Sequence, residues 1–225
     1  SNSGWMSQRL GRAGLEVARH TSVRDDRAEL VAALVEVAGR SDAALVSGGL
    51  GPTRDDLTME VLAATFGRKL VLHQPSLDAL RAFFARFGRE MAAINEKQAW
   101  FPDGAEVLDN PIGTAPGAML EVQRGEGKGS AFFFCMPGVP RELYKMMDEQ
   151  VLPRIASRLR VTSWARATLL RTFGLGESNL DEMLRDIGLP EGAALTYRAF
   201  NGDFIQSLRH SERGRVLHSC FVRDV

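Results

Sequence analysis

The feature that most constrains this chain is a glycine-rich loop between an apolar run and a helical pattern. Residues 43–46 form a short apolar run that is typical of a buried parallel strand, and residues 59–66 continue as a helix that Gly67 ends. The loop between them, residues 47–58, would lie at the carboxyl end of a strand, where open α/β sheets bind ligands. Glycines let a backbone approach an anion at a helix N-terminus, so the loop predicts a ligand that carries phosphate.

Adjacent carboxylates, Asp55 and Asp56, lie where that helix begins. N-capping and a favourable interaction with the helix dipole would explain one of them. Two carboxylates beside a phosphate loop would repel the anion unless a hard cation such as Mg²⁺ lay between them. The residues alone leave both interpretations open: helix capping, or metal binding and catalysis.

A second strand-to-helix loop follows the apolar run 131–136. Pro137-Gly138-Val139-Pro140 ends that run, and Pro140 can occupy the first turn of the next helix, so the Gly138 amide is a second potential anion donor. Both loops follow apolar strands and precede helices. We therefore expect residues 48–56 and 137–140 to lie within one cleft at the carboxyl edge of a shared sheet.

The remaining pattern predicts alternating helices and strands. Expected helices cover residues 2–13, 28–38, 75–87, 140–159 and 177–187, and Pro153 is expected to kink or end the first part of the helix over 140–159. Expected strands cover residues 15–19, 70–72, 119–123, 131–136, 168–173 and 193–200, and the strands 119–123 and 131–136 are expected to form a β-hairpin. Phe83, Phe84 and Phe87 have helical spacing and are expected in the core. Asp25 and Asp26 are expected at a helix start.

Five segments, in this order, carry a resemblance that covers nearly the whole chain. They are GGLGPTRDDLT (48–58), NEKQA (95–99), NPIGTAPG (110–117), MPGVPREL (136–143) and FGLGES (173–178). They resemble the N-terminal domain of the CinA (competence/damage-inducible) family, within the molybdopterin-binding superfamily. The resemblance implies an α/β fold, with a mostly parallel three-layer αβα sheet in residues 1–160 and a small α+β subdomain in residues 161–225.

The same resemblance concerns the start of the chain. In the family a first strand and a loop with an acidic motif precede the first helix, whereas this chain opens on the helix, so we expect that strand to be missing here. The exposed sheet edge would then need a cover. A strand of the natural protein is the cover we favour, dimerisation is second, and an element from the C-terminal region is the third alternative.

Composition excludes several classes of protein. With 44% hydrophobic residues, 25% charged residues and a formal net charge of zero, the chain shows no sign of disorder or of a basic nucleic-acid surface. Cys135 and Cys220 are too few and too far apart for a zinc site or a disulfide framework, which favours the reducing cytoplasm. No apolar run reaches the roughly 18 residues of a membrane span, and no signal peptide is recognisable. A soluble, cytoplasmic protein is expected.

The function follows from the loops and the resemblance together. The family's association with ADP-ribose pyrophosphatase activity implies Asp56 and Asp55 as catalytic residues and as ligands of a divalent metal, Mg²⁺ or similar. The alternative is a non-catalytic module that binds a molybdopterin or nucleotide, or serves assembly. Leu50 and Pro52 follow the CinA pattern, which favours a nucleotide over a pterin. A homodimer is expected, with no nucleic acid or membrane as partner.

The candidate ligand-binding residues come from the glycine loops and from the positions that match the family. They are Asn2, Ser3, Asp25, Gly48, Gly49, Gly51, Pro52, Thr53, Thr58, Asn95, Lys97, Gln98, Gly113, Thr114, Pro137, Gly138, Pro140 and Glu142. Lys97 is the strongest phosphate candidate among the side chains because it is a cation.

Overall fold

The computed structural model describes residues 1–15, 17–125, 128–159, 165–172, 176–186, 193–200, 203–211 and 220–221. The helices are α1 (Asn2–Arg12), α2 (Arg27–Arg40), α3 (Thr58–Thr65), α4 (Gln74–Arg86), α5 (Pro140–Met146), α6 (Leu152–Arg158) and α7 (Glu177–Leu184), with a 3₁₀ segment η1 (Ala93–Ala99) and a π-helical turn η2 (Met147–Val151). The strands are β1 (His20–Thr21), β2 (Ala43–Ser47), β3 (Leu70–Leu72), β4 (Trp100–Pro102), β5 (Glu106–Leu108), β6 (Gly117–Gln123), β7 (Ser130–Met136), β8 (Ala165–Thr172), β9 (Ala193–Phe200), β10 (Asp203–Ser211) and β11 (Cys220–Phe221).

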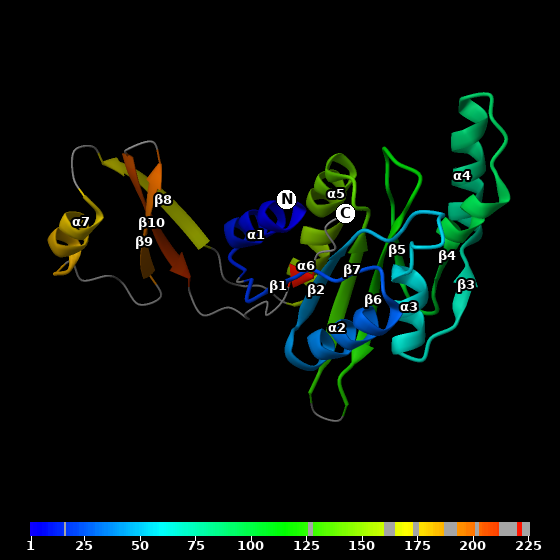
Figure 1. Ribbon diagram of the computed structural model, residues 1–225, viewed down its shortest axis with the longest axis horizontal. Coiled ribbons are helices and arrows are strands. Elements are labelled where there is room, and N and C mark those ends of the chain that lie inside the picture. Colours follow the sequence, from blue (N-terminus) through cyan, green and yellow to red (C-terminus); the bar gives the residue numbers. More distant parts are fainter. Residues whose placement is uncertain are drawn as a thin grey trace.

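The central sheet has the order β2-β7-β6-β5, and helices cover both of its faces (Figure 1). β2 and β7 are parallel, whereas β6 is antiparallel to both of its neighbours, so the sheet is mixed. The α/β class expected from the sequence is confirmed, but the expectation of a mostly parallel sheet was wrong, because among the described pairs of this sheet only β2 and β7 run parallel. Ser47 pairs with Met136 at the ends of β2 and β7, and the loops that follow these two strands therefore start at the same edge of the sheet.

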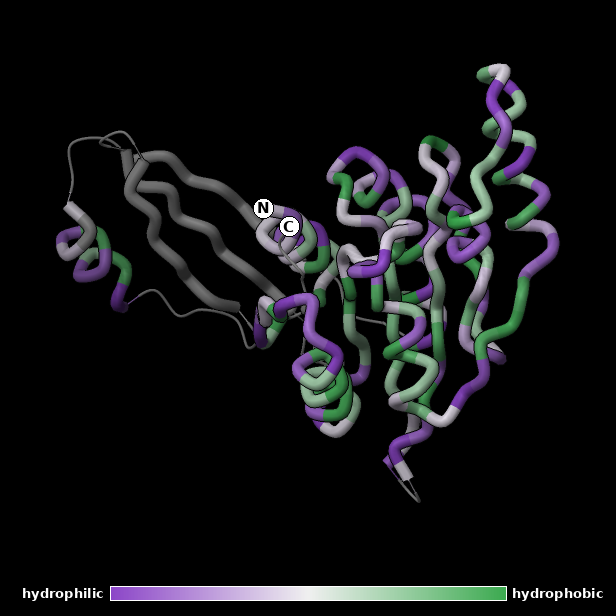
Figure 2. The backbone as a smooth tube through the Cα atoms, turned by 45° about the vertical axis from the view of Figure 1, so that its right-hand side comes forward, coloured by the Kyte–Doolittle hydropathy of each residue, from purple (hydrophilic) through white to green (hydrophobic). Residues whose placement is uncertain are grey.

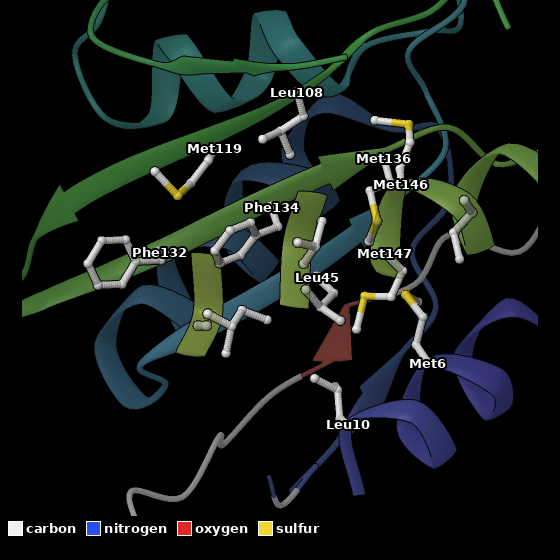
Figure 3. Close-up of a cluster of buried hydrophobic side chains, with 14 of the residues drawn as sticks. Met6, Leu10, Leu45, Leu108, Met119, Phe132, Phe134, Met136, Met146 and Met147 are labelled. Carbon is white, nitrogen blue, oxygen red and sulfur yellow. The ribbon is translucent and has the colours of Figure 1, made fainter. Parts of the chain in front are cut away.

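Two hydrophobic cores lie on the two faces of this sheet. One contains Met6 and Leu10 of α1 with Phe134 and Met146, as Figure 3 shows. The other packs α2 and α3 against the opposite face. Figure 2 shows hydrophobic residues predominating along the central strands, while the helices mix both kinds. Since both faces are covered, β7 is apolar without alternation, as strands buried on both sides are.

The strand expected at residues 15–19 was wrong, because β1 begins only at His20. Gly14 adopts a left-handed φ of 81° and the Leu15 amide donates to the Leu10 carbonyl at 3.0 Å, so these residues end α1 in place of starting a strand. β1 pairs in parallel with β11, and β11 also contacts β2. An element of the C-terminal region thus lies at the β2 edge of the central sheet. Of the three covers expected for this edge, it was the least favoured.

The helix expected over residues 140–159 is divided. α5 ends at Met146, the π-helical turn η2 follows, and α6 contains Pro153 in its first turn. Proline has no N–H to donate and disrupts the preceding helical hydrogen bonds, so the expected break at Pro153 is confirmed.

The β3–β4 pair and α4 form an arm that extends away from the central sheet (Figure 1). Leu77 and Leu80 of α4 are buried against Ala99. The expectation that the phenylalanines of this helix are core residues was wrong, since Phe87 is 62% exposed and Phe83 and Phe84 are only partly buried. Within the described residues, the side of α4 that carries Leu77 and Leu80 is the buried one, and the phenylalanines lie largely outside this contact.

The C-terminal part forms a sheet of its own with the order β8-β10-β9, in which β10 is antiparallel to both neighbours. β8, α7 and β9 correspond to the strand, helix and strand expected there, and β10 inserts between the two strands. Residues 173–175 of the FGLGES segment lie outside the described residues. Within the described residues, every helix is too short or too polar to cross a bilayer.

Candidate functional site

Three loops meet at the carboxyl end of β2 and β7. The first loop (48–57) follows β2, the second loop (109–116) joins β5 to β6, and the third loop (137–139) follows β7. Together with η1 and α5 they line a cavity of about 420 Å³, called the loop cavity below. Its lining residues are Gly48, Gly49, Leu50, Gly51, Pro52, Asp56, Gln98, Thr114, Ala115, Pro137, Gly138, Val139 and Glu142. The first and third loops thus share one cleft, as the sequence predicted.

The first loop is held in place from both sides. Gly48 and Gly49 have φ values of 96° and 68°, in the left-handed region that favours glycine. The Gly48 amide donates to the Met136 carbonyl at 2.9 Å, and the buried Thr58 hydroxyl donates to the Gly48 carbonyl at 2.9 Å. β7 and α3 therefore fix the loop, and Thr58 supports it from behind the cavity.

Asp56 does not cap α3. The N-cap position is Leu57, and no side chain caps this helix. Instead, Asp56 Oδ2 accepts hydrogen bonds from the Thr53 amide at 2.9 Å and from the Thr53 hydroxyl at 2.6 Å, which closes a turn within the loop. The capping interpretation was therefore wrong for Asp56, and the carboxylate faces the loop cavity.

Asp55 is oriented differently from Asp56. It is exposed, shares the single hydroxyl proton of Thr53 with Asp56 Oδ2 through a short hydrogen bond, and lines none of the three cavities described for this chain. This hydrogen bond, with its own backbone amide and the nearby Lys97 charge, lowers the pKa of Asp55 below its ordinary value. Asp55 thus stays ionised at the rim of the loop.

Backbone amides supply the hydrogen-bond donors of the loop cavity. In the part of the chain that the structure describes, the amides of Gly49, Gly51 and Gly138 donate to no protein acceptor. The charged side chains of the lining are Asp56 and Glu142, and the lining contains no Lys or Arg. The cavity thus offers an anion free N–H groups and, at the same time, negative charge.

Glu142 is positioned by Asn110 of the second loop. The Asn110 side-chain amide donates to Glu142 Oε2 at 2.7 Å and to the Ala115 carbonyl at 3.0 Å, and its oxygen accepts from the Gly113 amide at 3.0 Å. A Cβ on Gly113 would lie 2.2 Å from Glu142 Oε2, so only glycine leaves room for this carboxylate. Sequence reasoning included Asn110 only within the NPIGTAPG segment and missed its contact with Glu142, which joins residues 32 positions apart.

The predicted N-terminal residues support the cavity without lining it. The Asn2 side-chain amide donates to the Gly138 carbonyl at 2.7 Å and to the Ser47 hydroxyl at 3.2 Å. Ser3 is buried and shares a hydrogen bond with the hydroxyl of Ser1, the N-cap of α1. Neither residue lines the loop cavity, so ligand contact by Asn2 and Ser3 stays a prediction, and Asn2 joins the first helix to the third loop.

Lys97 is engaged by protein groups. Its Nζ lies 3.0 Å from Glu60 Oε1 and donates to the Thr53 carbonyl at 3.0 Å, and the Arg27 guanidinium lies 3.0 Å from Glu60 Oε2. Lys97 lines a neighbouring cavity and not the loop cavity. It therefore ties the first loop to α3 and η1.

The structure brings ten of the predicted residues into the loop cavity and places the others around it. The ten are Gly48, Gly49, Gly51, Pro52, Asp56, Gln98, Thr114, Pro137, Gly138 and Glu142. Asn2, Ser3, Asp25, Thr53, Asp55, Thr58, Asn95, Lys97, Gly113 and Pro140 do not line it. Asp26, not Asp25, caps α2 by accepting from the Glu29 amide at 2.9 Å.

The donor set decides what kind of metal site is feasible. The described residues contain no group of three or more His, Cys, Asp and Glu side chains that could hold a metal ion. Mg²⁺ is commonly bound by one or two carboxylates together with substrate phosphates and water. Asp56 lies beside the free amides of the loop cavity, so it fits a site that is completed by substrate phosphates and water. It does not fit a site whose ligands all come from the protein.

Comparison with known proteins adds a family to this geometry. Residues 1–157 match the family model described as "Probable molybdopterin binding domain". The chain is 48% identical over 202 residues to a CinA-like protein of Anaeromyxobacter sp. (strain Fw109-5), covering 88% of this chain and 47% of that protein. It is 39% identical over 200 residues to a CinA-like protein of Shewanella amazonensis, covering 89% of this chain and 46% of that protein.

A solved structure extends the similarity to three dimensions. The crystal structure of the protein CinA, with unknown function, from Thermoplasma acidophilum superposes with a TM-score of 0.58 at 30% identity, covering 68% of this chain and 86% of that one. The chain spans about half the length of the curated relatives it matches.

Proposed function

The chain belongs to the CinA-like family through its molybdopterin-binding-type domain. On this premise we propose that it binds a nucleotide pyrophosphate such as ADP-ribose in the loop cavity. We propose further that it hydrolyses the pyrophosphate bond with the help of a divalent cation. The observation that carries the proposal is the convergence of free backbone amides and the Asp56 carboxylate in one cavity. Backbone amides bind phosphate oxygens. The carboxylates of the cavity lining would repel the phosphates unless a cation lay between them.

The roles of the chain's own residues follow from their placement. The amides of Gly49, Gly51 and Gly138 would hold phosphate oxygens, and Asp56 would hold the cation jointly with those phosphates. When bound, the cation would neutralise phosphate charge and activate water. Asn110 holds Glu142 through Oε2, which leaves Oε1 available. Glu142 can therefore accept the proton of a water that attacks phosphorus as the bridging P–O bond breaks.

The test compares neighbouring aspartates. Asp56→Asn should abolish Mg²⁺-dependent hydrolysis of ADP-ribose, because it removes the only one of the two adjacent carboxylates that faces the loop cavity. It should cost about 0.5–1.5 kcal/mol of stability for the weakened turn with Thr53. Asp55→Asn, the matched control, should keep most of the activity. The measurements are product release with Mg²⁺ or Mn²⁺ and urea denaturation.

Each result has a definite meaning. Normal hydrolysis by the Asp56→Asn variant would leave Asp56 with a purely structural role in the loop. If the unaltered chain binds ADP-ribose but releases no product with any divalent cation, the domain is a binding module. The match to a family of probable molybdopterin-binding domains makes that module the second candidate.

A further inference from the structure

A second cavity adjoins the loop cavity and has a different character. It has a volume of about 440 Å³, and it shares with the loop cavity a wall formed by Gly49, Leu50, Gly51, Asp56 and Gln98. We call it the apolar cavity. Small-molecule sites commonly enclose about 300–1,000 Å³, so this cavity is large enough for a ring system of a ligand.

The side of the apolar cavity away from the shared wall is hydrophobic and aromatic. It is formed by Met59, Leu70, Ile94, Trp100, Phe101 and Pro116. Trp100 and Phe101 are consecutive residues of β4, and Trp100 remains 36% exposed. Aromatic and sulfur-containing side chains of this kind favour contact with flat rings.

The charged groups of the apolar cavity disfavour an anion. Asp56, Glu60 and Glu96 contribute carboxylates, and the one cation of the lining, Lys97, is already 3.0 Å from Glu60. Among the described residues Glu96 accepts no hydrogen bond and forms no ion pair. A ligand group that donates N–H bonds would suit Glu96, whereas a phosphate would be repelled.

Gln98 in the shared wall points to the same kind of ligand. Its side chain is only 6% exposed, and its amide nitrogen makes long contacts of 3.5 Å to the Leu50 carbonyl and 3.4 Å to the Thr114 hydroxyl. Its buried Oε1 has no hydrogen-bond partner in the described part of the chain. Buried polar atoms are nearly always satisfied, so the unpaired Oε1 of a residue that lines both cavities suggests a ligand N–H donor that reaches it once the Gln98 side chain turns.

From these observations we infer that the apolar cavity receives the flat, N–H-bearing heterocycle of the ligand whose phosphates lie in the loop cavity. The inference rests on the proposed function for the position of the phosphates. The ring stacks against the Trp100 side, and its N–H groups donate to Glu96 and toward Gln98. Nucleobases and pterins share this chemistry, and the experiment separates them.

The experiment uses the full chain and calorimetric titration with four probes: adenosine, pterin, ADP-ribose and inorganic pyrophosphate, each with Mg²⁺. Glu96→Ala and Trp100→Leu are compared with Glu90→Ala and Phe87→Leu, exposed residues that line none of the three cavities. We expect Glu96→Ala and Trp100→Leu to weaken the binding of ADP-ribose at least tenfold and the binding of pyrophosphate less than twofold. The two control variants should bind every probe as the unaltered chain does.

The free heterocycles identify the source of the ring. Tighter binding of adenosine than of pterin, lost in Glu96→Ala, indicates a nucleobase, and the reverse order indicates a pterin. The inference is overturned if Glu96→Ala binds ADP-ribose and both heterocycles as the unaltered chain does. It is also overturned if the substitution weakens the binding of pyrophosphate as much as the binding of ADP-ribose. Because Trp100 pairs with Leu72 in the β3–β4 sheet, the Glu96 variant decides the matter should Trp100→Leu fail to fold.

Failure of the proposed function would look different. If ADP-ribose binds with the expected variant pattern but is never hydrolysed, the ring site stands and the hydrolase proposal fails. If ADP-ribose is hydrolysed and Glu96→Ala leaves both its KM and its affinity unchanged, the hydrolase proposal stands and the ring site fails.

Discussion

Gly51 shows how a single residue limits the geometry of the acidic loop. A Cβ at this position would lie 2.4 Å from Asp56 Oδ2 and 2.9 Å from the carboxylate carbon. The same Asp56 oxygen is fixed by the amide and hydroxyl of Thr53. A side chain at residue 51 would therefore displace the carboxylate from the cavity or break the turn.

We expect Gly51→Ala to reduce both Mg²⁺-dependent hydrolysis and pyrophosphate affinity at least tenfold, because Asp56 must move. Gly39→Ala is the control, since a Cβ there meets nothing within 4 Å and α2 should gain about 0.5–1 kcal/mol from alanine. Titration calorimetry and urea denaturation check both. Unchanged affinity in a folded Gly51→Ala variant would argue against a role for the Asp56 position.

At the scale of elements, one ion-pair network ties three helical segments to the first loop. Glu60 of α3 lies between Arg27 of α2 and Lys97 of η1, and Lys97 continues to the Thr53 carbonyl. Burial opposes ionisation of Glu60, but the hydrogen bonds and charges of Lys97 and Arg27 outweigh it and lower the pKa of Glu60 from 4.5. The charged form of Glu60 is therefore favoured in the folded state.

This pKa shift predicts how stability depends on pH. A carboxyl with a lowered pKa stabilises the fold fully above pH 4.5 and loses that contribution as pH falls through its folded-state pKa. Glu60→Gln should lower the urea midpoint at pH 7, and the difference from the unaltered chain should vanish at acid pH. Glu90→Gln should show no difference at either pH. A Glu60→Gln deficit that is constant across pH would contradict the electrostatic explanation.

The contact between β6 and β7 also depends on one residue. A Cβ on Gly117 would lie 2.4 Å from the Cys135 carbonyl and 2.8 Å from Met146 Cε. We expect Gly117→Ala to lower the free energy of unfolding by about 1–3 kcal/mol, as overpacking does. Urea denaturation measures this, and stability equal to that of the unaltered chain would show that β6 can shift without loss.

At the scale of the whole molecule, the two cores and the cavities serve different ends. The cores on both faces of the sheet hold β2 and β7 in register. The loop cavity lies among the loops beyond the ends of these strands, and the apolar cavity lies between the first loop, α3, η1 and the β3–β4 pair. None of the residues that form the loop cavity belongs to a metal cage that folding would require. Leu50 and Ala115 nevertheless belong to the second core and also line the loop cavity, so the cavity wall rests directly on that core.

Removal of metal should leave the ligand-free fold intact. A chelator should leave the Tm of the ligand-free chain unchanged, because the described residues contain no cluster of three or more metal-ligating side chains. ADP-ribose with Mg²⁺ should raise the Tm more than either alone, since a ligand that binds only the folded state stabilises it. Thermal scans with and without chelator measure both effects. A large drop in Tm on chelation would indicate a structural metal and contradict this account.

The sequence by itself determined the features that depend on neighbours along the chain. The glycine loop after an apolar run, the α/β class, the β6–β7 hairpin and the break near Pro153 were all predictable, because strand and helix periods and the chemistry of glycine and proline are local. Joint placement of the first and third loops also followed, since parallel strands end at the same edge.

Only the tertiary structure decided which polar groups meet. Lys97 is paired with Glu60, and Asn110 holds Glu142 across 32 positions of sequence. Likewise, the exposure of Phe87 depends on how far α4 projects from the rest of the fold. Hydrogen bonds, ion pairs and burial depend on distances in space between segments far apart in the chain, and sequence spacing does not contain those distances.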